Sequence, residues 1–414
     1  MERVLLRNTD NPNSFEIDEY IRMGGYRSLG KAVGMKPADI IEEVKKSGLR
    51  GRGGAGFPTG MKWSFAVADT EMPKYLLCNA DEGEPGTFKD RPILEKNPHL
   101  LLEGMVISAY AIGAETGYIY LRGEYPEAKD VLWNAIKQAY ERNYLGDNIM
   151  GKGVKFRLSV HCGAGAYICG EETALVESLE GKRGQPRIKP PFPVNQGFLA
   201  KPTVINNVET LANVPYIMEI GADAYSQIGT PDSPGPKLYC VSGHVKRPGV
   251  YELPMGVPLK EIIYTHCGGI TGGRKLKAVI PGGVSTPVLT ADKIDCPMDF
   301  LHLSKQGSML GSGAVIVFDD SVDMIKVCLR ITRFFEHESC GKCTPCREGV
   351  GWMRAILERI VNGEGRNGDM DLLREVSSNI TGKTLCALGD GAAIVVRNFM
   401  EKFRDDFREK IGNR

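Results

Sequence analysis

The pattern of apolar and polar positions divides the chain into three regions. In the first region, apolar runs bounded by turn residues predict buried strands, and apolar residues spaced three or four apart predict helices. Strands are expected at 74–78, 116–122 and 154–161, and helices at 37–47, 98–112, 126–141 and 171–180. The proline-rich stretch 182–202 predicts a surface loop. Because strands and helices alternate along the chain here, we expect a three-layer α/β domain over residues 1–236.

The pattern of apolar and polar positions changes after the turn-rich stretch "GTPDSPGPK". Short strands are expected at 237–245, 249–254, 277–283 and 286–290, around one helical stretch at 258–266. They predict a small β-grasp domain over residues 237–320. From Ser321 onwards the spacing is helical, with helices expected at 321–337, 346–362, 369–379 and 391–411. A bundle of about four helices over residues 321–414 fits this pattern.

Composition narrows the class of protein. With 42% hydrophobic and 25% charged residues the chain resembles an ordinary soluble protein, and its net charge of +1 excludes the basic surplus typical of nucleic-acid binding. No apolar run approaches the roughly 18 residues that span a bilayer, and the first 20 residues lack the features of a signal peptide. We therefore expect any membrane association to be peripheral, through a partner. Eleven cysteines without a secretion signal indicate reduced thiols and a metal site rather than disulfides.

The stretch "ESCGKCTPCREG" contains the only clustered cysteines, Cys340, Cys343 and Cys346. Both a tetrahedral zinc and a four-iron cube require four ligands. Cys328 sits in a helix with apolar spacing, where a buried structural thiol is expected. Cys386 sits in a glycine-flanked turn before the last helix, where the helix dipole favours an anionic cluster, so we choose it as the fourth ligand. Three closely spaced cysteines with a remote fourth favour [4Fe–4S] over zinc, which remains the alternative.

The glycine-rich stretch "SGLRGRGGAGFPTGMKW" predicts a close approach of the backbone to a ligand. It is not a dinucleotide-binding fingerprint, because it follows a helix and has the wrong spacing. Arg52 and Lys62 could meet a phosphate, and Phe57 and Phe65 offer flat surfaces for a ring. A tight surface turn is the alternative.

Three further stretches carry polar side chains next to strand or helix ends. "NADEGEPGTFKDR" follows a strand, where ligands of open α/β sheets gather; its Asn79 suits the edge of a heterocycle, although its acidic residues could form a solvated turn. "GAGAYICGEET" places glycines before a helix start, where Glu171 and Glu172 suit ribose hydroxyls better than phosphate. In "TVINNVET", Asn206 and Asn207 could be ligand contacts or simply helix caps.

These motifs, together and in this order, closely resemble the NADH-binding flavoprotein subunit of respiratory complex I, from about residue 20 to the end. Diaphorase subunits of NAD-linked hydrogenases and formate dehydrogenases share the same core, often with additional iron–sulfur domains for which this chain has no cysteine motif. The resemblance implies a Rossmann-like FMN-binding domain, a β-grasp (ubiquitin-like) domain and a helical bundle that binds one [4Fe–4S] cluster.

The resemblance also implies roles for individual residues. Glu84 would lie at the nicotinamide end and Lys62 near the flavin, where it would favour the reduced, anionic form; these two are the expected catalytic residues. Glu172 would meet ribose hydroxyls. The full set expected to contact FMN or NADH is Gly51, Arg52, Gly53, Gly54, Ala55, Phe57, Lys62, Phe65, Asn79, Asp81, Glu84, Tyr167, Gly170, Glu171, Glu172, Phe192, Asn206 and Asn207. The expected cluster ligands are Cys340, Cys343, Cys346 and Cys386.

The implied activity is hydride transfer from NADH to FMN, followed by transfer of single electrons to the cluster and on towards quinone. Since one cluster accepts one electron at a time, a further acceptor is expected on another polypeptide. The resemblance points to a thioredoxin-like [2Fe–2S] subunit and a larger iron–sulfur subunit as partners. It also implies a place in the peripheral arm of a membrane complex, on the cytoplasmic or matrix side. No nucleic-acid partner is expected.

Overall fold

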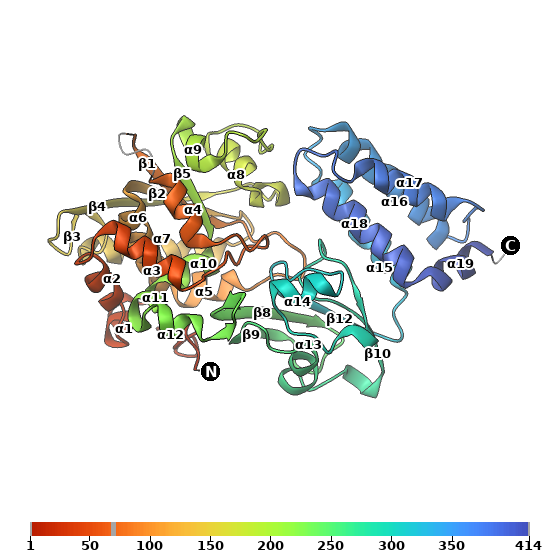
Figure 1. The fold of residues 1–414 in the computed structure, drawn as a ribbon, viewed down its shortest axis with the longest axis horizontal. Helices are drawn as coiled ribbons and strands as arrows, with labels where there is room; N and C mark the ends of the chain where they lie inside the picture. Colours follow the sequence, from red (N-terminus) through yellow and green to blue (C-terminus); the bar gives the residue numbers. More distant parts are fainter. Residues whose placement is uncertain (1, 68–71, 413–414) are drawn as a thin grey trace.

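The computed structural model describes residues 2–67 and 72–412, arranged as an α/β region, a smaller β-rich region and a helical bundle (Figure 1). The α/β region is built on a five-stranded sheet with the strand order β3-β4-β2-β1-β5. Its strands are β1 (Lys74–Ala80), β2 (Ala114–Leu121), β3 (Gly146–Ile149), β4 (Val154–Cys162) and β5 (Thr203–Asn207). All neighbours are parallel except β3, which pairs with β4 in the antiparallel sense.

Strand β5 is an element that the hydrophobic pattern does not predict. The proline-rich loop over residues 182–202 leads into β5, which pairs with β1 from Tyr75↔Thr203 to Asn79↔Asn207. Because β2 and β4 lie on one side of β1 and β5 on the other, the strand order reverses at β1. Ligands of open α/β sheets bind at such a switch point, outside the carboxyl ends of the strands.

The helices of the α/β region surround this sheet. The predicted helices at 37–47, 98–112, 126–141 and 171–180 are present with small changes of boundary. In full the helices are α1 (Ile17–Arg22), α2 (Arg27–Ala32), α3 (Pro37–Lys46), α4 (Thr59–Ala66), α5 (Asp90–Lys96), α6 (Pro98–Ile112), α7 (Pro126–Glu141), α8 (Glu172–Leu179), α9 (Pro193–Gln196), α10 (Val208–Ala212), α11 (Val214–Ile220) and α12 (Ala222–Ser226). Helix α6 is almost entirely buried, and α10 crosses it at Gly104, where an added Cβ would lie 2.1 Å from the carbonyl oxygen of Leu211.

The β-rich region is a second five-stranded sheet with the order β11-β10-β12-β8-β9. Its strands are β8 (Pro236–Gly243), β9 (Gly249–Pro254), β10 (Leu276–Ile280), β11 (Leu289–Thr290) and β12 (Ala314–Asp319). The central pair β12 and β8 is parallel and the other pairs are antiparallel, as in a β-grasp sheet. The sequence pattern missed β12, although "AVIVFD" is a typical buried strand. A short hairpin, β6 (Gly229–Thr230) with β7 (Ser233–Pro234), leads into this sheet.

Two short helices complete the β-rich region. Helix α13 (Leu259–Glu261) continues as a π-helical turn over Ile262–His266, within the predicted stretch 258–266, and α14 (Phe300–Lys305) precedes β12.

The bundle consists of α15 (Met324–Glu338), α16 (Thr344–Val361), α17 (Asp369–Ile380), α18 (Ala387–Lys402) and α19 (Arg404–Gly412). The single helix predicted over 391–411 is wrong: two helices meet at Phe403, whose φ of −118° interrupts the helical backbone. Phe335, Phe399 and Phe407 are fully buried between these helices. Within residues 2–67 and 72–412, no helix is both long and apolar enough to cross a bilayer.

The N-terminal segment joins the first two regions. The backbone N–H groups of Val4, Leu5 and Leu6 donate to the carboxylate of Glu252 on β9, at 2.8–2.9 Å. Burial raises the pKa of this carboxylate, and the three donors counteract that rise. Leu5 is completely buried and Leu6 nearly so, so this segment is part of the packed structure.

Candidate functional site

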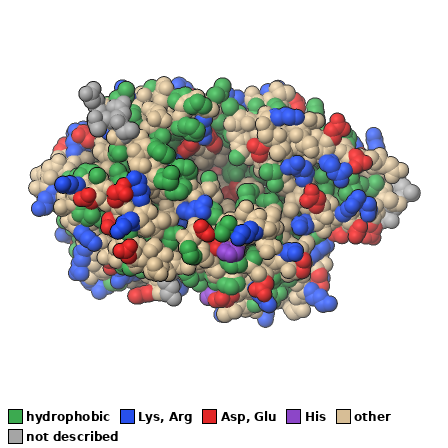
Figure 2. Space-filling view, viewed as in Figure 1, with side chains coloured by type: hydrophobic (Ala, Val, Ile, Leu, Met, Phe, Trp, Pro, Cys, Tyr) green, Lys and Arg blue, Asp and Glu red, His purple; other side chains and the backbone are tan. Residues whose placement is uncertain are grey.

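A cavity of about 300 Å³ lies where the three regions meet. On the face seen in Figure 2, the surface is hollowed between the α/β region and the bundle. The α/β region contributes the loop after β1, the glycine loop and the segment before α8, while the β-rich region contributes Ser285 and Ser312. The bundle contributes Phe335, Cys386 and Leu388. The cavity therefore borders the parallel sheet on one side and a predicted cluster ligand on the other.

Asn79 and Asp81, at the carboxyl end of β1, form one wall of this cavity. The Asn79 amide donates to the carbonyl oxygen of Gly170 at 2.8 Å, and its own oxygen accepts from the N–H of Asp81 at 3.0 Å. Oδ2 of Asp81 is buried and has no hydrogen-bond partner among the residues that the structure describes. Burial raises the pKa of Asp81 from its ordinary value of 3.8 to about 7. A buried oxygen without a donor indicates that a ligand supplies one.

Glu84 lies on the same wall and is held from two sides. Tyr167 donates its hydroxyl to Oε2 of Glu84 at 2.5 Å, and the N–H of Ser285 donates to Oε1 at 2.7 Å. Burial raises the pKa of Glu84, although both donors oppose the rise. Because Ser285 belongs to the β-rich region, the position of this carboxylate depends on how two regions pack.

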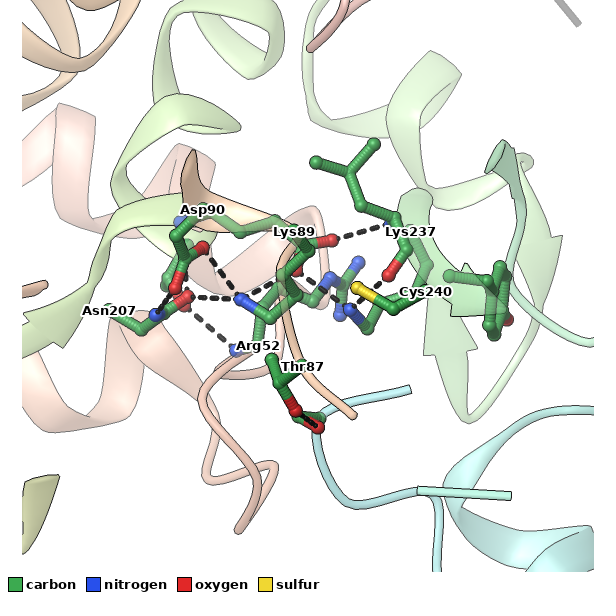
Figure 3. A network of polar contacts seen from close by, with 12 residues as sticks. Arg52, Thr87, Lys89, Asp90, Asn207, Lys237 and Cys240 are labelled. Carbon is green, nitrogen blue, oxygen red and sulfur yellow. Dashed lines mark hydrogen bonds and ion pairs between the residues drawn. The ribbon is translucent and has the colours of Figure 1, made fainter. Parts of the chain in front are cut away.

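Asn207, at the end of β5, faces the cavity and is oriented by two charged neighbours (Figure 3). Its amide nitrogen donates to Asp90 at 2.6 Å, and its oxygen accepts from the ammonium group of Lys89 at 3.1 Å. The same oxygen also accepts from the N–H of Glu209, so the helix-cap interpretation of Asn207 is correct as well. Asn206 is different: its amide oxygen accepts from the indole of Trp63 at 2.9 Å, and it does not line the cavity.

Lys89 belongs to a buried ionic network that sequence analysis missed. Its Nζ lies 2.7 Å from Asp90 and 3.0 Å from Glu209, which in turn lies 2.7 Å from Nζ of Lys237 on β8. Burial alone would lower the pKa of Lys89, but the surrounding carboxylates outweigh it and raise the pKa. The network links the cavity wall to the β-rich sheet, and the "FKD" sequence by itself gives no signal for it.

Glu82 is buried, not part of a solvated turn. Its carboxylate accepts from the backbone N–H groups of Lys89, Asp90 and Arg91 and from the hydroxyl of Tyr125. Burial raises its pKa to about 7. This carboxylate holds the loop after β1 in the shape that presents Asp81 and Glu84 to the cavity.

The glycine loop approaches the cavity through Gly53 and Gly54. A Cβ on Gly53 would lie 3.2 Å from Cβ of Asn207, and Gly54 has a φ of +142°, so both positions favour glycine. Gly51 donates its N–H to the carbonyl of Phe57 and closes the loop, while Ala55 is exposed near its tip.

The expectation that Arg52 meets a phosphate is not supported by its position. Its side chain is buried, and it donates to the carbonyl oxygens of Arg50, Pro234 and Pro236. The guanidinium therefore anchors the glycine loop to the hairpin before β8.

The remaining predicted residues form an outer group beside the cavity. Phe57 and Phe65 are half exposed, with ring centroids 6.5 Å apart, and Phe192 is also exposed. Lys62 donates to Glu172 at 3.0 Å and to the carbonyl of Ile205 at 2.9 Å. This group presents exposed aromatic rings close to paired charges, an arrangement suited to a nucleotide.

Lys189 is a member of this outer group that the sequence pattern missed. Its ammonium group lies 2.8 Å from Glu171 and 3.0 Å from Glu172. Burial would raise the pKa of Glu172, but Lys62 and Lys189 together lower it, so this carboxylate is ionised at neutral pH. Glu171 also caps α8 by accepting from the N–H groups of Thr173 and Ala174.

The four predicted cluster ligands lie near one another: Cys340 is in the loop after α15, and the other three are at the starts of α16 and α18. Cys343 and Cys386 are the N-cap residues of α16 and α18, and Cys346 lies in the first turn of α16. Burial raises the pKa of Cys386 to about 12, and the nearby sulfur groups of Cys340 and Cys346 add to the rise. Cys328 is buried within α15, away from this group, as expected for a structural thiol.

The spacing of the donor set, three cysteines in CxxCxxC with a remote fourth, fits a cube of four irons. Within residues 2–67 and 72–412, no three His, Cys, Asp or Glu side chains converge as one metal ion requires. A zinc ion holds each thiolate sulfur at about 2.3 Å and so draws the four together. In a four-iron cube each thiolate binds a different iron, which leaves the sulfurs further apart. The cavity fits a flavin in two respects: Oδ2 of Asp81 lacks a partner among the described residues, and the glycine-lined wall allows a close approach of the ligand to the backbone.

Comparison with known proteins agrees with this geometry. The family model "Nuo51 FMN-binding domain" matches residues 44–216, "SLBB domain" matches residues 237–317, and "NADH-ubiquinone oxidoreductase-F iron-sulfur binding region" matches residues 326–410. The fold and the site thus define a flavoprotein with an FMN-binding α/β domain, a β-grasp-like domain and an iron–sulfur bundle.

Relatives of this class cover the whole chain. The F 2 subunit of the NADH-quinone oxidoreductase of Rhizobium meliloti is 58% identical over 100% of this chain and 98% of its own. The F subunit of the corresponding enzyme of Aquifex aeolicus is 50% identical over 98% of this chain and 94% of its own. The chain belongs to the family of the F subunits of NADH-quinone oxidoreductase, and the resemblance seen in its motifs is confirmed.

A solved structure shares the fold as well. The crystal structure of an NAD⁺-reducing [NiFe]-hydrogenase in the H₂-reduced state superposes with a TM-score of 0.88 at 38% identity. The match covers 100% of this chain and 67% of the hydrogenase chain.

Proposed function

We propose that this chain oxidises NADH as the flavoprotein subunit of an NADH:quinone oxidoreductase, respiratory complex I. The observation that carries the proposal is that one cavity is lined from two sides: Asn79 and Asp81 face it from the parallel sheet, and Cys386 faces it from the bundle. FMN would accept a hydride and release single electrons to a [4Fe–4S] cluster; this chemistry belongs to the cofactors.

The protein's own contribution is to bind, orient and shield. Asp81 and Asn79 would hold FMN from the end of β1, with Asn207 beside them at the end of β5 and Gly53 next to Asn207, since these residues line the cavity. Tyr167 and Gly170 belong to the same wall. Glu84, fixed by Tyr167 and Ser285, would face the nicotinamide end of the dinucleotide.

The outer group would bind the adenosine half of NADH. Phe57, Phe65 and Phe192 offer exposed rings for stacking, which is worth about 0.5–1.5 kcal/mol beyond the area buried. Glu172 is ionised and suits ribose hydroxyls. Lys62 donates to Glu172 and to the carbonyl oxygen of Ile205 in β5. Its positive charge would therefore act on the flavin electrostatically, across β5, rather than by direct contact.

We propose the partners and location that fit this role. A thioredoxin-like [2Fe–2S] subunit and a larger iron–sulfur subunit would receive the electrons, in a peripheral arm on the cytoplasmic or matrix side of the membrane. The chain would divide into units at 236/237 and 320/321; the start of β8 at Pro236 and of α15 at Met324 supports these positions.

A second candidate is the diaphorase subunit of an NAD-linked hydrogenase or formate dehydrogenase. The observation in its favour is the likeness to the NAD⁺-reducing hydrogenase structure. Both candidates share the half-reaction with NADH and differ in where the electrons go.

One purification separates these possibilities. The chain, affinity-tagged at its own locus, is purified under mild conditions, and its co-purifying subunits, FMN and iron are measured. Quinone-reductase subunits and one FMN per chain are the expected result, with flavin absorption that bleaches on addition of NADH. Hydrogenase or formate dehydrogenase subunits would favour the second candidate, and a flavin that stays oxidised under NADH would contradict both.

The same material tests the need for a partner. Expressed alone, the chain should be poorly soluble or poorly loaded. A monodisperse monomer with full FMN and iron content, as stable as the co-expressed complex, would contradict an obligate partner.

A further inference from the structure

The proline-rich loop of the α/β region contacts the loop between α15 and α16 of the bundle, which carries Cys340 and Cys343. The connecting part is residues 183–187, "RGQPR", which we name the strap. Gln185 donates its amide to the carbonyl oxygen of Cys340 at 3.1 Å, and Arg183 donates to the same oxygen at 3.3 Å. Lys342 returns a hydrogen bond to the carbonyl oxygen of Pro186 at 2.6 Å.

These contacts dominate the interface between the two regions. In the part of the chain that the structure describes, four hydrogen bonds join the α/β region to the bundle, and three of them involve the strap. The fourth runs from the N–H of Tyr167 to Glu338 at 3.0 Å. All four involve residues 338–342, at the end of α15 and in the loop between α15 and α16 that carries Cys340 and Cys343. This short segment therefore makes the polar connection between the regions.

The strap is firmly held on its other side, so it can act as a support. A Cβ on Gly184 would lie 2.5 Å from Sγ of Cys169, which shows that the strap passes tightly over the segment Tyr167–Gly170 that lines the cavity. The N–H of Arg187 donates to Thr173 at 2.9 Å, and its guanidinium pairs with Glu177 and Glu180. The strap is thereby fixed to α8 and to the cavity wall.

We propose that Gln185 and Arg183 are positioning residues for the iron–sulfur cluster. By holding the Cys340 carbonyl they fix the backbone that carries the Cys340 thiolate. Groups that hydrogen-bond to a ligand residue orient the ligand, and their removal typically lowers metal affinity about 10–100-fold. Arg183 also brings a positive charge to the cluster loop, and positive charge and hydrogen bonds raise the reduction potential of an iron–sulfur cluster.

Two matched pairs of variants test the proposal, which rests on the proposed function, in the assembled complex. Gln185→Glu keeps the shape of the side chain and removes the donor; its control is Gln196→Glu, an exposed glutamine of α9 with the same charge change. Arg183→Gln removes a charge; its control is Lys182→Gln, the adjacent residue, which pairs with Glu180 instead of the cluster loop. The readouts are the midpoint potential of the cluster from an EPR-monitored redox titration, the rate of iron loss to a chelator, and FMN content.

Both strap variants should keep FMN, while the cluster potential moves to more negative values and iron is lost about tenfold faster in Gln185→Glu. The controls should match the unmodified protein. Loss of the cluster from Gln185→Glu with FMN retained would support the same role. If that variant does not fold, Arg183→Gln carries the test, because this side chain is exposed. Potentials and iron-loss rates in both strap variants equal to those of their controls would overturn the proposal.

Discussion

The ammonium group of Lys62 lies 3.0 Å from Oε2 of Glu172, and that carboxylate is ionised because Lys62 and Lys189 lower its pKa. Both lysines are occupied by acidic partners, so neither is free to receive the extra phosphate of NADPH. Under the proposed function, in which Glu172 meets the adenosine ribose, this pair influences which nicotinamide nucleotide the protein accepts.

We predict preference for NADH and its relaxation in Glu172→Gln. The 2′-phosphate of NADPH carries a charge of about −1.5 to −2, which the Glu172 carboxylate repels. The substitution removes the repulsion and frees Lys62 and Lys189, so the ratio of kcat/KM for NADPH to that for NADH should rise about tenfold, or about 1.4 kcal/mol. Steady-state kinetics with ferricyanide as acceptor measure it, with the exposed Glu115→Gln as control. Equal kcat/KM for the two nucleotides in the unmodified protein would contradict the assignment.

The second prediction concerns the fourth cluster ligand. Cys386→Ser should lose the cluster or its normal EPR signal while FMN stays bound, because Cys386 caps α18 beside Cys340 and Cys346. Cys328→Ser should keep its iron, since that thiol is buried within α15 and contacts Thr332. Iron and FMN analysis of both variants decides the matter, and iron loss from the Cys328 variant alone would show that the assignment is wrong.

Glu84→Gln should alter nucleotide binding without loss of FMN. The neutral amide keeps the contact with Ser285 but removes the negative charge, so the relative affinities for NADH and NAD⁺ should change, by about tenfold for a charge-assisted contact of about 1.4 kcal/mol. Tyr167→Phe, which removes one of the two donors to Glu84, should give a smaller change in the same direction. Kinetics with NAD⁺ as product inhibitor provide the measurement. A flavin-free Glu84→Gln protein would instead assign Glu84 to FMN binding.

The fourth prediction uses the raised pKa of Asp81, from 3.8 to about 7. The folded protein holds this proton to higher pH than the unfolded chain does, so its stabilising contribution is complete below about pH 4 and is lost as pH rises to 7. Melting temperatures of the FMN-free protein should fall over this window. Asp81→Asn should flatten the fall only in part, because other buried carboxylates, Glu82 and Glu84 among them, also have raised pKa values.

The same substitution should weaken FMN binding. Asp81 lines the cavity, and its buried Oδ2 has no partner among the residues that the structure describes. A charged hydrogen bond to a ligand is worth about 1.5–3 kcal/mol, so the Kd for FMN should rise at least tenfold. Fluorescence quenching on titration of FMN measures this. Unchanged FMN affinity together with an unchanged pH profile would remove Asp81 from the site.

Most elements with a strong local pattern were predicted, although β12 was overlooked despite its apolar sequence, and a strand that depends on a distant partner was not predicted. Strand β1 and the helices 98–112 and 126–141 follow from their own apolar spacing. Strand β5 is only five residues long and emerges from a proline-rich loop, so its identity depends on pairing with β1, more than 120 residues earlier. Its absence from the prediction also hid the switch point that explains the location of the cavity.

Candidate residues divide in the same way. The cysteine trio and Cys386 could be proposed as ligands from the sequence, because ligand spacing and helix starts are local features, and the structure places these cysteines near one another. The charge that suggested a phosphate contact for Arg52 is visible in the sequence, whereas the carbonyl groups of Pro234 and Pro236 that bind it are not. Lys89 was overlooked because its role depends on contacts with Asn207 and Glu209, which are distant in the sequence.

The cavity is lined by residues from Gly53 to Leu388, and this span has a consequence for biogenesis. A nascent chain that has emerged from the ribosome only as far as β5 can close the parallel sheet, yet it lacks Ser285, Ser312 and Cys386. A flavin captured at that stage would be exposed on one side to oxygen and water. Because Cys386, Ala387 and Leu388 complete the lining, the cavity can be closed only after the last helices of the bundle have been synthesised and have docked.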